Sequence, residues 1–154
     1  MDRGTIEREL RIAASPEVVF AVISQPEHIR GWWGAETTIT PEPGSTGALA
    51  WTDAASGEVS TVPITVVEVD PPRRFAFRWT QAAGEAASAA NSLLVTFDLE
   101  PVDGGTRLRF AETGYRERDW EIALLEETYQ QHAIGWDRFL PRIAERATRV
   151  VTTA

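Results

Sequence analysis

The chain has neither cysteine nor lysine, so its 15 basic residues are all arginine. The absence of cysteine excludes disulfides, thiol nucleophiles and cysteine-ligated metal sites. The absence of lysine excludes Schiff-base chemistry and the phosphate-binding P-loop, which both need a lysine amine. Composition alone therefore excludes several familiar kinds of catalysis.

Histidine is also scarce, and the common catalytic motifs are missing. His28 and His132 are far apart in the sequence, and neither has the spacing of a metal-binding pair such as HxxxH. The GxSxG and GxGxxG motifs are absent. We therefore expect no metal and no cofactor, and an enzyme built on this sequence would depend on acid–base groups placed in a pocket.

Long apolar runs are absent as well. The first ten residues, MDRGTIEREL, are charged and do not resemble a signal peptide, and no run is long enough to span a bilayer. We therefore expect a cytoplasmic protein without membrane insertion. With 154 residues, the chain has the length of one domain, and we treat residues 1–154 as a single domain.

The net charge of −8 disfavours nucleic-acid binding, because the protein would repel phosphate backbones. One local exception is a row of arginines near the C-terminus, at Arg138, Arg142, Arg146 and Arg149. Their spacing places them on one side of a helix. They mark either a site for an anionic partner or an ordinary solvated helix face, whose cations suit a helix C-terminus.

Two short helices are predicted after a first strand over residues 5–12, in which the apolar positions alternate. Ser15 is a suitable N-cap and Pro16 a suitable first helical residue, so the first helix should run to about Ser24. Pro26 should open a second helical turn that ends near Gly31.

The middle of the chain alternates apolar and polar residues, as half-buried strands do. Pro63 indicates an edge position or a bulge, and residues 103–105 form a tight hairpin. The stretch 81–91, rich in alanine, glycine and serine, should be a mobile loop. We expect Arg78 and Arg109 to face solvent. The opposite face, which should lie against the last helix, carries Leu49, Trp51, Phe75, Phe77, Trp79, Leu93, Val95, Phe97, Leu99, Leu108 and Phe110.

Residues from Leu125 to Ala147 have helical spacing, which predicts a helix of about 25 residues with one broad apolar stripe. The stripe consists of Leu125, Tyr129, Ala133, Trp136, Leu140, Ile143 and Ala147. Gly135 and Pro141 lie inside this helix, at costs of about 1 and about 3 kcal/mol relative to alanine. Either another interaction offsets these costs or the helix bends.

Antiparallel strands before and after an early helix pair, followed by one long helix, predict an α+β fold with its helices on one face of the sheet. The sheet must curve to cover so long a helix.

The order of four strings is similar to that in a known family. These strings are SPEVVFAVISQPEHIRGWWG, VVEVDPPRRFAFRW, VTFDLEPVDGGTRLRFAETGY and HAIGWDRFL. The chain resembles the START-like (SRPBCC) superfamily, and within it the family of homologues of the activator of the heat-shock protein 90 ATPase. The resemblance implies a helix-grip fold, in which a curved antiparallel sheet wraps around a long C-terminal helix, often with an apolar cavity between them. In such a fold, Gly135 would let the helix approach the sheet or leave room beside Trp136, unless it is merely tolerated, and a bend at Pro141 would follow the sheet.

Aromatic residues are the strongest candidates for a binding site, since six tryptophans exceed what a core of this size needs. Either they fill the core or they line a wide interior suited to flat apolar ligands. The candidate ligand-binding residues are Trp33, Trp51, Phe77, Trp79, Phe97, Phe110, Tyr115, Tyr129, His132, Trp136 and Leu140.

Three of these candidates carry ionisable groups. His132 either orients a ligand or acts as a general base, or it is a residue at the core edge that a carbonyl or water satisfies. Tyr115 and Tyr129 either offer hydroxyls to a ligand or pack with their hydroxyls in solvent.

We therefore expect the protein to bind a small, largely apolar ligand, aromatic or lipid- or polyketide-like, in a cavity between sheet and last helix. Binding is favoured over catalysis because no catalytic set can be named. Two alternatives follow from the resemblance: a co-chaperone-like protein that acts on a partner's surface, and a cyclase or hydratase that acts on a bound substrate. The sequence leaves open whether the protein is a monomer or a homodimer.

Overall fold

The structure, a computed structural model, describes residues 5–80, 84–88, 91–115 and 122–153. Its elements in chain order are β1 (Thr5–Ile12), α1 (Pro16–Ser24), α2 (Pro26–Trp33), β2 (Glu36–Thr37), β3 (Thr46–Thr52), β4 (Val59–Asp70), β5 (Arg74–Trp79), β6 (Leu93–Val102), β7 (Gly105–Thr113) and α3 (Ile122–Thr153). The strands of the described residues form one antiparallel sheet in the order β1-β7-β6-β5-β4-β3-β2.

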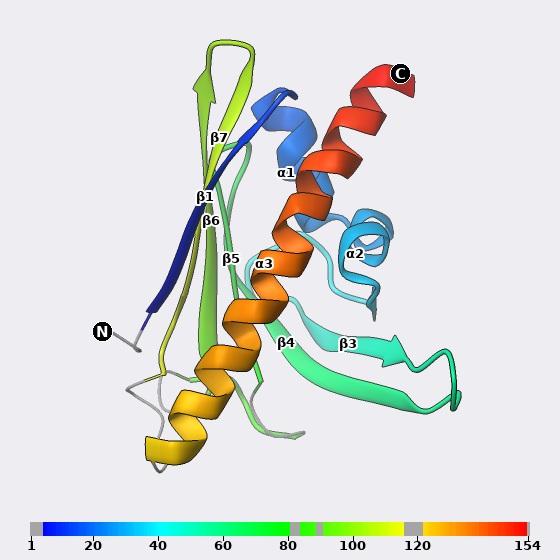
Figure 1. Ribbon diagram of the computed structural model, residues 1–154, viewed down its shortest axis with the longest axis vertical. Helices are drawn as coiled ribbons and strands as arrows, with labels where there is room; N and C mark the ends of the chain where they lie inside the picture. The colour runs from blue at the N-terminus through cyan, green and yellow to red at the C-terminus, as the bar shows by residue number, and fades with distance from the viewer. Residues whose placement is uncertain (1–4, 81–83, 89–90, 116–121, 154) are drawn as a thin grey trace.

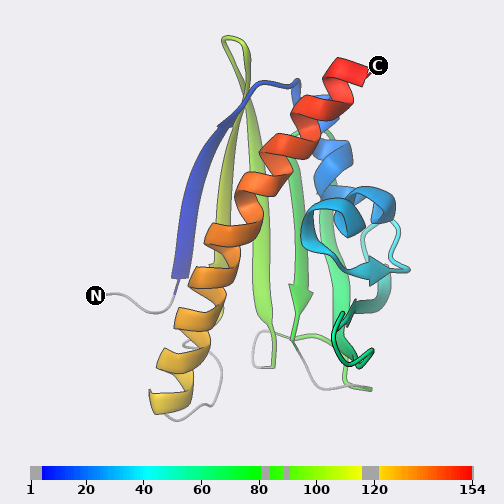
Figure 2. The same ribbon diagram turned by 45° about the vertical axis from the view of Figure 1, so that its right-hand side comes forward.

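All three helices lie on one face of this sheet. α3 crosses the sheet diagonally, and α1 and α2 lie beside its C-terminal half (Figures 1 and 2). The strand β4 bends along its length, with a bulge between Val66 and Glu68 (Figure 1). The predicted α+β helix-grip fold, a curved antiparallel sheet around a long C-terminal helix with two short helices after the first strand, is confirmed.

Pro63 occupies the kind of position that its missing N–H requires. It pairs with Ala48 of β3, whereas the pairing of β4 with β5 begins only at Ile64. In the described pairing, Pro63 therefore lies where β4 has a neighbour on one side, as the sequence predicted.

The first helix has the predicted boundaries, and the second is longer than predicted. The Ser15 hydroxyl accepts a hydrogen bond from the backbone N–H of Val18 at 3.3 Å, so it caps α1 as expected. α2 does not end near Gly31 but continues to Trp33. It ends there because Gly34 has a φ of 75°, in the left-handed region that terminates helices. Gly31 lies inside this helix, where its missing side chain makes room for the Arg146 guanidinium, which lies where a Cβ would be.

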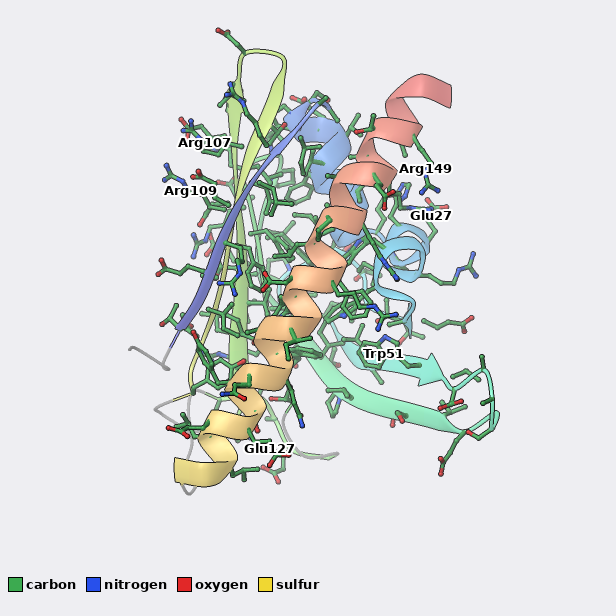
Figure 3. The ribbon with its side chains drawn as sticks, viewed as in Figure 1. Glu27, Trp51, Arg107, Arg109, Glu127 and Arg149 are labelled. Atoms are coloured by element: carbon green, nitrogen blue, oxygen red, sulfur yellow. The ribbon has the colours of Figure 1, made fainter. Side chains whose placement is uncertain are left out.

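The predicted strand register is correct. The inward face carries the buried residues Leu49, Phe75, Phe77, Trp79, Leu93, Val95, Phe97, Leu99, Leu108 and Phe110. Arg107 and Arg109 project from the sheet on the side away from α3 (Figure 3). On that face Arg109 pairs with Glu9 across β1 and β7 at 3.2 Å. The sheet thus separates an apolar interior from an ion-paired outer surface.

The helix α3 has 32 residues, so it is longer than the predicted 25 or so. The additional residues extend it beyond both ends of the predicted stripe, Leu125 and Ala147. The predicted stripe is confirmed: Trp136, Leu140, Ile143 and Ala147 are buried, while Leu125, Tyr129 and Ala133 are partly buried against the core. α3 continues as one element on both sides of Pro141, which is exposed (Figure 1).

The predicted mobile loop, 81–91, falls partly outside the described residues, at 81–83 and 89–90; residues 84–88 and 91 belong to no helix or strand. Among the described residues, no helix combines the length and apolarity that crossing a membrane requires.

Candidate functional site

Trp33 is the centre of a cluster of aromatic rings between the sheet and α3. Its ring centroid lies 5.0 Å from that of Trp79, 5.1 Å from that of Trp136 and 5.6 Å from that of Trp51. It also stacks on Trp32 at 5.1 Å with nearly parallel planes. These separations are those of favourable aromatic contacts, so most of the interior is filled by rings rather than open.

Local structure places Trp33 in the interior. Because α2 continues to its last residue at Trp33 before Gly34 turns the chain, both tryptophans of the pair Trp32–Trp33 are carried inward, and they are 1% and 4% exposed. The indole N–H of Trp32 donates to the Val22 carbonyl at 2.8 Å, and that of Trp51 donates to the Trp33 carbonyl at 3.0 Å. These hydrogen bonds tie the end of α2 to α1 and to β3 and fix both rings.

A small apolar pocket remains beside this cluster. Its volume is about 180 Å³, and its lining is formed by Trp33, Trp51, Trp79, Gln131, His132, Gly135, Trp136 and Phe139. Trp51, labelled in Figure 3, reaches it from β3, while the last five of these residues come from α3. The pocket therefore lies between α3 and the sheet, where α2 also reaches the helix.

Gly135 faces open space. A Cβ built on Gly135 meets no atom within 4 Å, so the helix backbone does not approach the sheet closely there. The hypothesis that Gly135 lets the helix backbone approach the sheet closely is therefore wrong. The alternative hypothesis, that Gly135 leaves room beside Trp136, agrees with the position of Gly135 in the pocket wall.

A buried carboxylate lies next to the pocket. Glu112 of β7 is fully buried, and its Oε2 accepts a hydrogen bond from the indole N–H of Trp79 at 2.9 Å. Its Oε1 accepts from the Tyr115 hydroxyl and lies 2.8 Å from Nδ1 of His132. The His132 side chain is 18% exposed, and its ring also lies 5.3 Å from that of Trp79. One wall of the pocket thus carries a histidine that a buried carboxylate holds in place.

Neither tyrosine hydroxyl is directed to solvent. Burial, and next the charge of Glu112, raise the pKa of Tyr115 far above its usual range, so this residue remains a hydrogen-bond donor. The hydroxyl of Tyr129 donates to the Thr5 carbonyl at 3.2 Å. The alternative of tyrosine hydroxyls in solvent is therefore wrong, and both hydroxyls instead connect parts of the protein.

The structure brings together only some of the candidate ligand-binding residues. Those that line the pocket are Trp33, Trp51, Trp79, His132 and Trp136. Those buried in the surrounding core are Phe77, Phe97, Phe110, Tyr115 and Leu140, whereas Tyr129 is partly buried at its edge. The sequence reasoning missed Gln131, Gly135 and Phe139 in the lining, and Glu112 behind it. Glu112 could have been found, since it follows Leu108 and Phe110 at the same alternation and so must point inward.

Larger depressions occur elsewhere but do not form a site. The largest of those described, about 570 Å³, lies over β1, β6 and β7 on the outer face and opens widely to solvent. Two of its charged side chains, Glu9 and Arg109, are ion-paired with each other. The smaller pocket is the better candidate because it lies in the aromatic cluster and adjoins the buried Glu112. No three His, Asp or Glu side chains gather as metal ligands within the part of the chain that the structure describes.

The other histidine lies away from the pocket. Nε of Arg146 donates to Nδ1 of His28 at 2.9 Å, which joins α3 to α2. Burial, and next the charge of Arg146, lower the pKa of His28. In the arginine row, Arg146 thus has an internal partner, and Arg138 and Arg142 lie over the ring of Phe139. This pattern agrees with a solvated helix face more than with a site for an anionic partner.

Comparison with known proteins agrees with this architecture. The structure is similar to a protein from Mesorhizobium loti, MLL2253, with 24% sequence identity, a TM-score of 0.73, and coverage of 94% of this chain and 97% of that one. It is also similar to the Aha1 dimer from Colwellia psychrerythraea, with 19% identity, a TM-score of 0.69, and coverage of 92% and 93%. DynU16, a putative protein in the dynemicin biosynthetic locus, is 18% identical with a TM-score of 0.67; the match covers 92% of this chain and 46% of DynU16.

These identities are low, so the solved structures establish the fold alone. No curated protein sequence matches the chain. A family profile does match, over residues 13–148, and its description is "Activator of Hsp90 ATPase homolog 1-like protein". The match includes both short helices, the strands from β2 to β7 and most of α3. The chain therefore belongs to the family of Activator of Hsp90 ATPase homolog 1-like proteins.

Proposed function

We propose that the protein binds a small apolar ligand with a single aromatic ring in the pocket between α3 and the sheet. The observation that carries this proposal is a largely apolar, partly open pocket of about 180 Å³ bounded by four tryptophan rings. Flat rings in such a space can contact the lining at the offset or edge-to-face geometries that aromatic pairs prefer.

The volume limits the size of the ligand. A dry apolar cavity of about 150 Å³ holds benzene, whereas drug-sized ligands occupy sites of about 300–1,000 Å³. The pocket, at about 180 Å³, therefore suits one ring rather than a long lipid chain or a fused polyketide. A larger molecule would bind only by inserting one ring and leaving its remainder outside the pocket.

The lining also favours aromatic over polar ligands. Its polar side chains are Gln131 and His132, and the rest of the wall is aromatic apart from Gly135. A charged ligand would lose its hydration there and gain few compensating hydrogen bonds. An uncharged ring loses little on entering and gains contact with Trp33 and Trp136.

Toluene and naphthalene provide the test. Because four tryptophans line the pocket, toluene binding should change the intrinsic tryptophan fluorescence saturably, with a dissociation constant between about 1 μM and 1 mM. Naphthalene is the size control and should bind at least tenfold more weakly. Calorimetric titration under the same conditions separates binding from an optical artefact.

The outcomes distinguish the alternatives. Saturable binding of toluene, with naphthalene at least tenfold weaker, supports a single-ring site. Stronger binding of naphthalene would show that the pocket opens to larger, polyketide-like ligands, and the size limit would be wrong. Binding of neither compound would remove the support for a ligand-binding role, and a partner-surface role like that of a co-chaperone would become the better hypothesis.

A further inference from the structure

The buried carboxylate beside the pocket is not explained by the binding of a plain aromatic ring. Glu112 is fully buried, yet no arginine pairs with it among the described side chains, and its ionic partner there is His132. Burying a carboxylate is costly unless it is paired and hydrogen-bonded. A hydrophobic core needs no such group, so its presence beside the pocket needs a reason.

The hydrogen bonds around Glu112 present it as an acceptor. Trp79 can only donate through its indole N–H, and Tyr115 stays protonated because burial raises its pKa. With both carboxylate oxygens accepting, Nδ1 of His132 carries a proton toward Oε1. Nε2 of the same ring is then the atom with a free lone pair.

Nothing within the described residues occupies this second nitrogen. No hydrogen bond to Nε2 of His132 is found there, while the ring itself lines the pocket. A carboxylate that holds one imidazole nitrogen while the other faces a binding site is the arrangement that makes histidine an effective proton acceptor. Gln131, the other polar residue in the wall, carries no charge and cannot play this part.

We propose that Glu112 and His132 form a proton-accepting pair and that the pocket takes phenols, whose hydroxyl proton passes to His132. This inference rests on the proposed ligand-binding function of the same pocket. In the transfer, the phenol O–H bond breaks, an N–H bond forms at Nε2, and the electron pair stays on the phenolate oxygen. The same proton returns to the oxygen on release, so no further reactant is needed.

The charges suit a phenol better than a carboxylic acid. A phenol enters the apolar pocket uncharged, so no ion is desolvated before the proton moves. After transfer, the phenolate lies beside the His132 imidazolium, and the Glu112 carboxylate balances part of the positive charge of that ring from the other side. A carboxylate ligand would instead bring a full negative charge toward a buried acid. Within this pair, His132 would touch the ligand, and Glu112 is a positioning residue.

Among the described residues, no other charged group is found in contact with Glu112 and His132. On β1, which pairs with β7, the residue opposite Glu112 is the apolar Ile6. The nearest charged residue of β1 on the inward side, Arg8, is bound to Asp137 of α3 at 2.6 Å. From β5 and the segment after β7, the groups that face Glu112 are Trp79 and Tyr115. The proton therefore has no other described acceptor at the pocket.

The test compares 4-nitrophenol with its methyl ether, 4-nitroanisole, which has no proton to give. At a pH below the pKa of free 4-nitrophenol, binding to the wild-type protein should produce the absorbance of the phenolate. This signal should saturate at the same concentration as the change in tryptophan fluorescence. We expect 4-nitrophenol to bind at least tenfold more tightly than 4-nitroanisole, a difference of about 1.4 kcal/mol.

Variants assign the effect to the pair. Glu112→Gln keeps the size of the side chain and removes its charge, so it should abolish the phenolate signal but retain 4-nitroanisole binding. Tyr129→Phe is the matched control, because that hydroxyl bonds Thr5 and does not line the pocket; its signal should equal that of the wild type. If Glu112→Gln does not fold, as circular dichroism would reveal, His132→Gln tests the same prediction at a partly exposed side chain.

The results separate this inference from the binding function on which it rests. Equal binding of both compounds, with 4-nitrophenol remaining protonated, would overturn the proton-accepting pair and leave the aromatic pocket intact. A phenolate signal that persists in both Glu112→Gln and His132→Gln would also overturn it. Failure of both compounds to bind, together with failure of toluene, would refute the binding function itself.

Discussion

Gly135→Ala should stabilise the protein and weaken ligand binding at once. A Cβ at Gly135 meets no atom within 4 Å, so the alanine methyl group causes no clash. The helix α3 extends well beyond Gly135 in both directions. An interior glycine costs about 0.8–1.0 kcal/mol relative to alanine, and the free energy of unfolding should therefore rise by about 1 kcal/mol. For a chain of this length, that rise corresponds to about 2–4 °C in Tm.

The same methyl group reduces the pocket. Its volume of about 180 Å³ exceeds the roughly 150 Å³ that holds benzene by only on the order of 30 Å³. One methyl group takes up most of that margin, so the affinity for toluene should fall at least tenfold. Gly135→Leu should remove binding altogether. Ile134→Ala is the control, because Ile134 is 71% exposed and does not line the pocket.

Two measurements check this prediction. Urea unfolding gives the change in stability, and calorimetric titration with toluene gives the change in affinity. Ile134→Ala should raise stability by a few tenths of a kcal/mol and leave the affinity unchanged. A Gly135→Ala protein that is less stable than the wild type would mean that the space beside Gly135 is already filled. Unchanged toluene affinity would place the ligand elsewhere.

Three further predictions concern other buried or constrained positions. Pro141→Ala restores the N–H that proline lacks at an exposed position of α3, so the free energy of unfolding should stay unchanged or rise; a loss beyond about 1 kcal/mol in denaturant unfolding would show that packing requires the proline. Because folding lowers the pKa of His28, the unfolded chain binds a proton at His28 at a higher pH than the folded protein does. The contribution of His28 to the free energy of unfolding is therefore fully present above about pH 6.5 and is lost as the pH falls below that value. His28→Gln should show a smaller loss of stability between pH 7 and 5 than the wild type, and an identical loss would contradict the assignment. Tyr115→Phe removes a donor from the buried Glu112 and should cost about 1–3 kcal/mol in thermal or urea unfolding, whereas no loss would mean that this hydrogen bond is unimportant.

The fold was predictable because its signals are local and periodic. Alternation placed Phe75, Phe77 and Trp79 on the inward face, and spacings of three and four placed Trp136 and Leu140 on the buried stripe. Caps were equally informative: Ser15 before a proline fixed the start of α1. Each of these signals depends on neighbours in the sequence, so no long-range information was needed.

The second helix and the site show where local reasoning fails. Gly31 looked like the end of α2, but the end is decided by the left-handed backbone at Gly34, and Gly31 instead accommodates Arg146 from a helix more than a hundred residues away. Whether a glycine ends a helix or makes room for a neighbour depends on contacts between distant segments, which a single sequence does not encode locally.

The size of the interior was also beyond sequence reasoning. Many tryptophans were compatible with a solid core or with a wide cavity, and the outcome depends on how the rings interlock. Trp33 reaches the centre of the cluster and fills most of the space, which leaves a pocket of about 180 Å³ beside Gly135. The inward position of Glu112 follows from the alternation of β7, but its hydrogen bonds to Trp79, Tyr115 and His132 depend on contacts between distant segments.

A crystal structure of the protein with toluene bound would show directly whether the ligand occupies the pocket between α3 and the sheet. We expect electron density for one ring between α3 and the sheet, in contact with Trp33, Trp51, Trp79 and Trp136, and with the backbone of Gly135 on the helix side. Density for toluene only on the outer face of the sheet, or a pocket that side chains close completely at saturating toluene, would contradict it.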